Sequence, residues 1–152
     1  MKWKGLLSLP LILLGAIDKN CSALQPDKKE VGLAHLVQAI CIKESNCDPN
    51  AIGDDGRAAG ITQMHCIMVD EVNRICKLLK ISLSFDYDDR WNAGESKRMC
   101  LVYLRFCQNY FNLDYEQLAR GWNGGMYGWK KVCTRQYGKD VIKIMKGLED
   151  GK

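Results

Sequence analysis

The stretch that decides the fold runs from Lys29 to Asn50 and reads KEVGLAHLVQAICIKESNCDPN. Between Lys29 and Lys43 the apolar residues recur at helical spacing, which predicts a helix with a broad buried face. The pair Asp48-Pro49 is expected to stop that helix, because proline disfavours a helical residue before it. A carboxylate, Glu44, therefore lies at the end of an apolar helical stripe.

Glu44 has two interpretations at this stage. By residue type alone, a glutamate is usually an ordinary solvated side chain at the protein surface. A carboxyl group at the end of a half-buried helix can instead be desolvated, which raises its pKa. Such a group holds a proton near neutral pH and can donate it to a leaving group.

The rest of the chain continues the helical pattern. A polar, glycine-containing loop is expected from Asn50 to Gly60, and an irregular segment from Ser84 to Trp91. No stretch alternates as a strand over more than a few residues. The fold class is therefore mainly α. The further helices are expected from Ile61 or Met64 to Leu79, Ala93 to Phe111, Leu113 to Trp122, and Val132 to Leu148.

The N-terminus has the pattern of a secretory signal peptide. A short basic start precedes the apolar run Gly5–Leu14, and small residues follow at Ala16 and again at Ala23. We assign residues 1–16, or alternatively 1–23, to this signal and residues 24–152 to one domain. An uncleaved anchor is the alternative, but the run is shorter than the roughly 20 residues of a membrane span. We expect a secreted or extracytoplasmic protein without stable membrane insertion.

The chain has 152 residues and a formal charge of +4. This mild basic excess suits an anionic polymer such as a bacterial wall. Its basic residues are scattered along the sequence, so nucleic-acid binding is not indicated.

Eight cysteines support export, because this density behind a signal peptide predicts disulfides. Zinc binding is disfavoured, since the sequence has no Cys-x-x-Cys pair. Cys100 and Cys107 would be ~10 Å apart along one helix. Bridged Cα atoms lie within ~7 Å, so these two should bond to other partners. The same reasoning disfavours a bond between Cys66 and Cys76.

Three further motifs follow the Glu44-Ser45 pair in order. They are the turn Gly60–Met64, the segment Asp89–Asn92 with Tyr103-Leu104 after it, and the turn Trp122–Gly125. In this combination the chain resembles the lysozyme-like superfamily, and most closely the catalytic domain of soluble lytic transglycosylases. The resemblance spans roughly residues 33–137. It implies a lysozyme-like helical domain, which the cysteines would staple with disulfides.

The resemblance also implies an activity, namely cleavage of the β-1,4 bond between N-acetylmuramic acid and N-acetylglucosamine in bacterial peptidoglycan. Glu44 would be the general acid and base, without cofactor or metal, in a monomeric protein. The alternatives are a lysozyme that hydrolyses the same bond, and an idle peptidoglycan-binding protein of the same fold. The residues implied to bind substrate are Ser45, Gln63, Met64, Trp122, Asn123 and Gly124.

One departure concerns Trp122, since the family commonly has a tyrosine there whose hydroxyl is expected to bond the catalytic glutamate. An indole N–H is a donor without acceptor capacity. No second carboxylate has an obvious matching position, and His65 is expected to be a structural or surface residue. Five aspartates are weaker candidates for a second catalytic carboxylate, and each is expected to be a solvated loop residue or a cap: Asp54, Asp55, Asp86, Asp88 and Asp89. Trp91, Tyr127 and Trp129 could stack on sugar faces, although aromatic residues are more often buried in the core.

Overall fold

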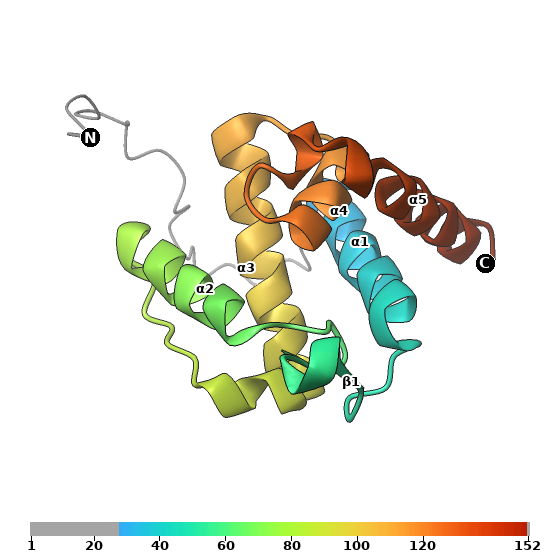
Figure 1. The fold of residues 1–152 in the computed structure, drawn as a ribbon. Coiled ribbons are helices and arrows are strands. Elements are labelled where there is room, and N and C mark those ends of the chain that lie inside the picture. The colour runs from blue at the N-terminus through green and yellow to red at the C-terminus, as the bar shows by residue number, and fades with distance from the viewer. Residues whose placement is uncertain (1–27, 152) are drawn as a thin grey trace, which may run out of the picture.

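The computed structural model describes residues 28–151. The predicted signal peptide lies outside these residues. The mainly α fold is confirmed, with one small hairpin between the first two helices (Figure 1). The longer helices are α1 (Lys28–Ser45), α2 (Cys66–Leu78), α3 (Ala93–Phe111), α4 (Tyr115–Gly124) and α5 (Arg135–Asp150).

Helix α3 runs through the middle of the molecule, between α2 on one side and α1, α4 and α5 on the other (Figure 1). Its bounds agree with the sequence prediction, because both ends carry local signals. Asn92 caps the first turn, with its side chain accepting from the backbone N–H groups of Gly94 and Glu95. Asn112 ends the helix in the left-handed conformation at φ 53°.

The predicted loop between α1 and α2 contains a short antiparallel hairpin. Strand β1 (Ile52–Gly53) pairs with β2 (Ala58–Ala59), and the 3-10 turn η1 (Asp54–Gly56) joins them. The register places Ile52 opposite Ala59. Strands of two residues are too short to show an alternating pattern, so these two strands could not be predicted.

Three predicted helix starts were too early, including that of α5, which was expected at Val132 and begins at Arg135. Helix α2 begins at Cys66, because Gln63 is left-handed at φ 50° and His65 is extended. Helix α4 begins at Tyr115 because Asp114 and Gln117 form a capping box. The segment before α5 is a pair of 3-10 turns, η3 (Gly128–Lys130) and η4 (Val132–Thr134).

The expectation of disulfide staples is not met in the described part of the chain, where all seven cysteines are free thiols. Four of them lie in the core, where a thiol packs as a small apolar side chain. Burial raises the pKa of Cys41 to about 12 and that of Cys107 to about 11. These thiols therefore carry little of the reactive thiolate. The four are Cys41, Cys76, Cys100 and Cys107.

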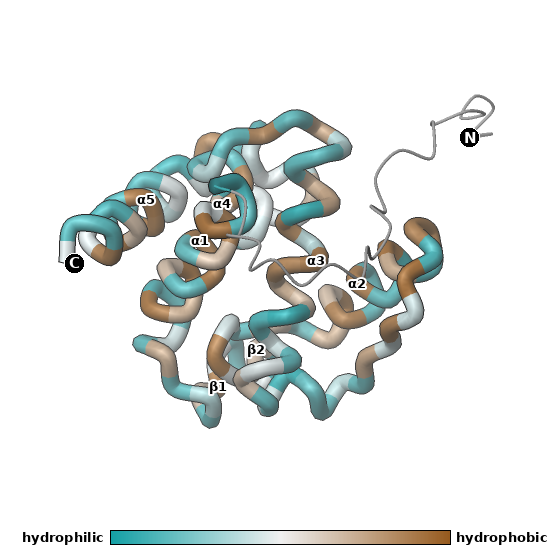
Figure 2. Tube along the Cα trace, turned by 180° about the vertical axis from the view of Figure 1, so that it is seen from behind, coloured by the Kyte–Doolittle hydropathy of each residue, from teal (hydrophilic) through white to brown (hydrophobic). Residues whose placement is uncertain are grey.

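Hydrophobic and hydrophilic residues are interspersed along the helices (Figure 2), and in α2, α3, α4 and α5 the hydrophobic residues gather on one face. The core lies where α1, α2, α3, α4 and α5 meet, and includes Leu36, Ile40, Val72, Leu104, Leu118 and Val141. Within residues 28–151, no helix combines the length and apolarity that a membrane span requires.

Candidate active site

Glu44 occupies the last turn of α1, where the chain changes direction sharply. Asn46 and Cys47 are both left-handed, with φ values of 53° and 65°. The N–H of Asn46 donates to the carbonyl of Ile42 at 3.0 Å, and that of Cys47 donates to the carbonyl of Cys41 at 3.1 Å. This cap fixes the helix end that carries the Glu44 carboxyl group.

The Glu44 carboxyl group has a partner that the sequence motifs did not include. The hydroxyl of Tyr137, in the first turn of α5, donates to Oε1 of Glu44 at 2.6 Å. Beside this bond, Nζ of Lys43 lies 2.9 Å from Oδ2 of Asp140. The two contacts join the end of α1 to the start of α5, so the position of Tyr137 depends on the packing of these helices.

The electrostatic surroundings of Glu44 raise the pKa of its carboxyl group. Burial raises the pKa of the Glu44 carboxyl above its ordinary value, and the charge of Asp54 raises this pKa further. The hydrogen bond from Tyr137 and the charges of Lys43 and His65 act in the opposite direction. The net direction is upward, which favours a protonated carboxyl at mildly acidic pH. Burial, together with the Glu44 charge, also raises the pKa of Tyr137, so this phenol remains a donor.

Ser45 connects the first motif to the second. Its hydroxyl lies 2.8 Å from the carbonyl oxygen of Ile61 and 3.3 Å from that of Cys41, in its own helix. A hydroxyl has one proton to donate, and the shorter contact goes to the Gly60–Met64 turn. Ser45 therefore acts as a tie between the helix end and this turn.

Gln63 uses its amide group inside the same turn. Its Nε2 donates to the carbonyls of Ala51 and Gly60, at 3.0 Å each. A Cβ at Gly53 would lie 2.2 Å from the Gln63 amide oxygen, and a Cβ at Gly60 would lie 2.0 Å from the carbonyl oxygen of Arg90. Gly60 also has φ +73°, so both close packing and backbone conformation require glycine there.

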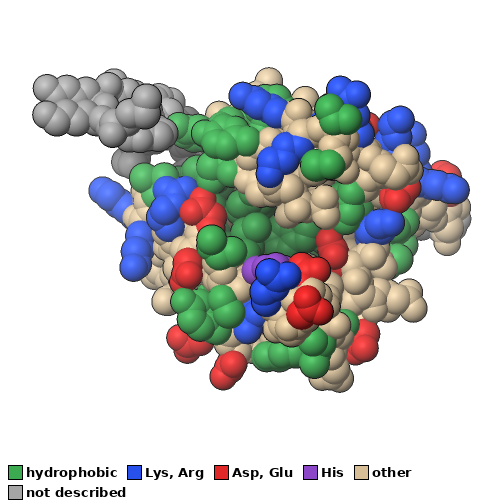
Figure 3. All heavy atoms as spheres, in the orientation of Figure 1, with side chains coloured by type: hydrophobic (Ala, Val, Ile, Leu, Met, Phe, Trp, Pro, Cys, Tyr) green, Lys and Arg blue, Asp and Glu red, His purple; other side chains and the backbone are tan. Residues whose placement is uncertain are grey.

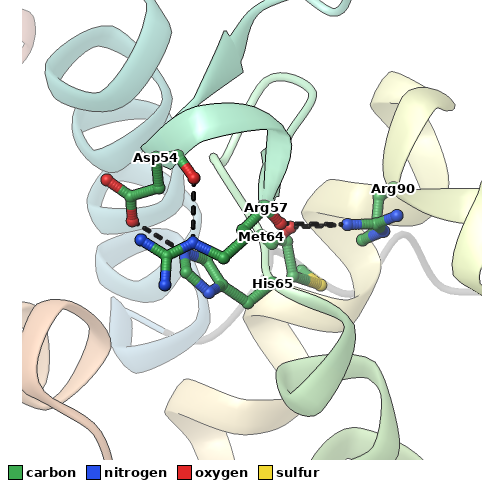
Figure 4. A network of polar contacts seen from close by, with 5 residues as sticks. All are labelled: Asp54, Arg57, Met64, His65 and Arg90. Carbon is green, nitrogen blue, oxygen red and sulfur yellow. Dashed lines mark hydrogen bonds and ion pairs between the residues drawn. The ribbon is translucent and has the colours of Figure 1, made fainter.

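Asp54 and His65 form a pair beside this turn. His65 Nε2 lies 2.8 Å from Asp54 Oδ2, and Figure 4 shows the carboxylate directed at the ring. Arg57 Nε donates to the backbone carbonyl of Asp54 at 2.9 Å. The buried guanidinium of Arg90 donates to the carbonyls of Met64 and Arg57, at 3.2 and 3.3 Å (Figure 4). Arg57 and Arg90 thus both hold the turn of the hairpin by donating to its backbone carbonyls.

The other predicted aspartates differ from Asp54. Asp86 and Asp89 form the capping box of η2 (Tyr87–Trp91), as expected for caps. Asp55 and Asp88 are exposed.

Two residues expected to bind substrate are buried instead. Met64 is 1% exposed, and its backbone pairs with Ala59 in an isolated bridge that places the side chain in the core. Trp122 is 7% exposed and packs edge-to-face on Tyr103, with ring centroids 5.8 Å apart. Both side chains fill the interior beneath the turns that carry them, and their direct contact with substrate stays a prediction.

The third motif places its remaining residues at the end of α4. The Asn123 side chain is exposed. A Cβ at Gly124 would lie 2.6 Å from the Thr134 side chain, so the turn packs closely on η4. The Gly124 carbonyl accepts from Lys131 Nζ at 2.8 Å. Asn123 is thus the member of this motif that is free to meet a ligand.

The aromatic candidates divide between surface and core. Trp91 and Tyr127 are exposed at 38% and 52%. Trp129 is half-buried, with Nζ of Lys130 4.8 Å from the centre of its ring.

The face of the molecule seen in Figure 1 is hollowed at its centre. Figure 3 shows hydrophobic side chains on the floor of this hollow, with acidic, basic and histidine side chains along its lower edge. In the same orientation the hairpin lies below the hollow and the segment from α4 to η3 lies above it (Figure 1). We call this feature the central hollow.

No group of three or more metal-binding side chains is found within residues 28–151. Comparison with models of known protein families, with curated protein sequences and with solved structures finds no match. Interpretation of the site therefore depends on its geometry and chemistry.

Proposed function

We propose that this chain cleaves the β-1,4 bond between N-acetylmuramic acid and N-acetylglucosamine in peptidoglycan, as a lytic transglycosylase of lysozyme-like fold. The observation that carries the proposal is the half-buried Glu44 carboxyl with the Tyr137 hydroxyl 2.6 Å away. Burial raises the pKa of the acid, which favours its protonated form before reaction, and the phenol donor stabilises the carboxylate once the proton has left.

The reaction needs one carboxyl group in two steps. Glu44 donates its proton to the glycosidic oxygen while the bond from this oxygen to the anomeric carbon breaks. The N-acetyl group of the substrate supports the positive charge that develops. Glu44 then takes the proton of the muramic acid 6-hydroxyl as this oxygen bonds to the anomeric carbon. The product has an anhydro ring, and Glu44 regains its proton.

The remaining motif residues support this assignment by holding the acid. Ser45 ties the end of α1 to the turn that contains Gln63, and the Gln63 amide holds that turn to Ala51. We propose that the glycan strand lies in the central hollow and that the exposed Asn123 side chain binds an acetamido group of the substrate. Backbone turns at Gly60 and Gly124 allow close approach of neighbouring segments.

Export belongs to the same proposal, because peptidoglycan lies outside the cytoplasm. We further propose that Cys41 and Cys47 pair when the protein folds with a disulfide oxidant such as oxidised glutathione. In the cap at the end of α1, the backbone nitrogen of Cys47 lies 3.1 Å from the carbonyl oxygen of Cys41, so the two residues are neighbours in space. Mass spectrometry after thiol alkylation tests this, and alkylation of both thiols in oxidised protein would contradict it.

The activity is tested by digestion of purified cell walls with the protein and with Glu44→Gln. The native protein is expected to clear the suspension, while the variant binds walls without clearing them. Glu149→Gln is a matched control, because Glu149 is exposed and distant from Glu44 in sequence. Equal clearing by all three proteins would eliminate Glu44 as the acid. Wall binding without clearing by the native protein would instead favour the idle binding protein.

A further inference from the structure

A groove with a volume of about 320 Å³ lies between α1 and α3. This volume falls at the lower end of the range of small-molecule sites in proteins. The described lining comes from these two helices and includes neither Glu44 nor Tyr137. We call this feature the α1–α3 groove. Helix α1 contributes Ala34, Val37 and Gln38 to it, and α3 contributes Gly94, Lys97, Arg98 and Leu101.

The groove exists because small residues stand on the two helix faces that form it. On each helix the lining residues recur at intervals of three and four, so each helix contributes one stripe. Ala34 and Gly94 have little or no side chain to fill the space between the stripes. Val37 and Leu101 supply apolar surface beside them. An occupant of the groove therefore needs an apolar part.

The cations of α3 beside the groove differ in their partners. Nη1 of Arg98 lies 3.4 Å from Oε2 of Glu95, and Nη2 of Arg105 lies 3.0 Å from Oε1 of Glu30 on α1. Lys97 is half-buried, and within residues 28–151 no carboxylate lies within 4.0 Å of its Nζ. Lys97 is thus the cation of the groove whose charge has no counter-charge in the described part of the chain.

The ammonium group of Lys97 is held in place by a neutral side chain. Its Nζ donates to Oε1 of Gln38 at 3.2 Å, and Nε2 of Gln38 donates to Sγ of Cys47 at 3.3 Å. The amide of Gln38 is therefore held at both of its polar atoms. An ammonium has three protons to donate, and this amide oxygen accepts one of them. A charge that is partly removed from water is stabilised by a counter-charge, which a ligand can supply.

The start of α3 does not offer a competing anion site. The side-chain oxygen of Asn92 accepts from the backbone N–H groups of Gly94 and Glu95, at 2.9 and 3.1 Å. These donors are already satisfied by the cap. The negative end of a ligand in the groove is therefore directed to Lys97.

We propose that the α1–α3 groove binds a small amphipathic anion, a short acyl chain that ends in one carboxylate. The carboxylate accepts from Nζ of Lys97, and the chain covers Val37 and Leu101 between the two helices. The apolar lining accounts for the chain, and the one cation without a carboxylate partner accounts for the single negative charge. The site is independent of the proposed cleavage of peptidoglycan, since it uses neither Glu44 nor Tyr137.

The test titrates octanoate, 1-octanol and acetate into the ¹⁵N-labelled protein and follows the backbone amide shifts by NMR. Octanoate has both the chain and the charge, whereas octanol lacks the charge and acetate lacks the chain. Octanoate is expected to give saturable shifts at the amides that line the groove. Octanol should bind about tenfold more weakly, between the effects of losing an exposed ion pair and a hydrogen bond to a charged group. Acetate should give no saturable shift.

Two substitutions test the two parts of the site. Lys97→Gln removes the charge, so octanoate should bind this variant about tenfold more weakly, as octanol binds the native protein. Ala34→Phe places a ring in the groove and should weaken the binding of both ligands. Lys139→Gln is the matched control, because it removes the same charge from an exposed position on α5 and should bind octanoate as the native protein does. Circular dichroism checks each fold, and Lys97→Gln tests the proposal by itself if Ala34→Phe does not fold.

Three results would overturn the inference. One is equal affinity of the native protein for octanoate and octanol, which would show apolar contact without recognition of the charge. Another is native affinity for octanoate in Lys97→Gln. The third is the absence of saturable shifts at the groove when octanoate is added to the native protein. None of these results bears on the cleavage of peptidoglycan, which the digestion of cell walls tests separately.

Discussion

Replacement of Tyr137 by phenylalanine removes one hydroxyl group and leaves the aromatic ring that packs between α1 and α5. The lost bond is the 2.6 Å contact from this hydroxyl to Oε1 of Glu44. A hydrogen bond to a charged group contributes about 1.5–3 kcal/mol. Glu44 becomes charged as it transfers its proton, so the bond stabilises the transition state more than the ground state. By the relation of about 1.4 kcal/mol for each tenfold change in rate, kcat should fall about 10- to 100-fold.

The pH profile gives a second, independent sign of the same effect. The bond from Tyr137 lowers the pKa of Glu44, so its removal lets burial raise that pKa further. The high-pH limb of the activity profile, where the acid loses its proton, should therefore move to higher pH. The assay is the initial rate of soluble muropeptide release across a series of buffers.

Tyr110→Phe is the control for the chemical change, because Tyr110 is 47% exposed and stacks on Phe106. Tyr110→Phe should keep the native rate, and the high-pH limb of its activity profile should stay at the native position. A Tyr137→Phe enzyme that retains the native rate to within about twofold, with an unmoved limb, would refute the assignment of this hydroxyl to the acid.

Three other substitutions test the supports of the site by urea unfolding. Glu44→Gln should raise the free energy of unfolding more at about pH 8 than at about pH 4, because ionisation of the buried Glu44 carboxyl destabilises the native fold once the pH exceeds its raised pKa. Each unit by which the folded-state pKa exceeds the unfolded-state pKa corresponds to about 1.4 kcal/mol. An equal effect of the substitution at both pH values would contradict the raised pKa. Ser45→Ala should lower the free energy of unfolding by about 0.5–1.5 kcal/mol and slow wall digestion, since the tie to Ile61 is lost. A Ser45→Ala protein with native stability and rate would show that the tie is not needed. Gly60→Ala should cost more than about 1 kcal/mol, because its backbone is left-handed and a Cβ would meet the carbonyl of Arg90; unchanged stability would disprove this packing.

The elements that could be predicted from the sequence are those with local signals at both ends. Helix α3 agrees with its expected bounds because Asn92 and Asn112 mark its first and last turns. The hairpin could not be predicted, because its strands are two residues long and are held by contacts with Arg90, which is distant in sequence. Its geometry depends on tertiary packing.

The site residues also differ in whether a local sequence signal or tertiary packing places them. Glu44 and Ser45 could be singled out because both lie at a helix end marked by Asp48-Pro49, and Ser45 does reach the second motif. The motifs did not include Tyr137, since its contact with Glu44 spans 93 positions of sequence and follows from the packing of α5 on α1. A tyrosine in the first turn of an amphipathic last helix was the one available signal.

The inward orientation of Met64 and Trp122 shows the limit of motif reasoning. A motif places a residue on a turn, but the packing of the turn decides which side chains meet solvent. At both positions the large apolar side chain fills the core, and the neighbouring Gln63 and Asn123 keep the greater exposure. Cysteine spacing likewise predicted staples, whereas the described cysteines are free thiols, four of which are buried in the core.

The most direct test of the proposal is the initial rate of muropeptide release from purified peptidoglycan, measured by liquid chromatography and mass spectrometry for the native protein and Glu44→Gln. The native protein is expected to release fragments cut between N-acetylmuramic acid and N-acetylglucosamine. The variant should release them at least about a hundredfold more slowly, since it has no proton to donate. Release of the same fragments at the same rate by both proteins would contradict the role of Glu44.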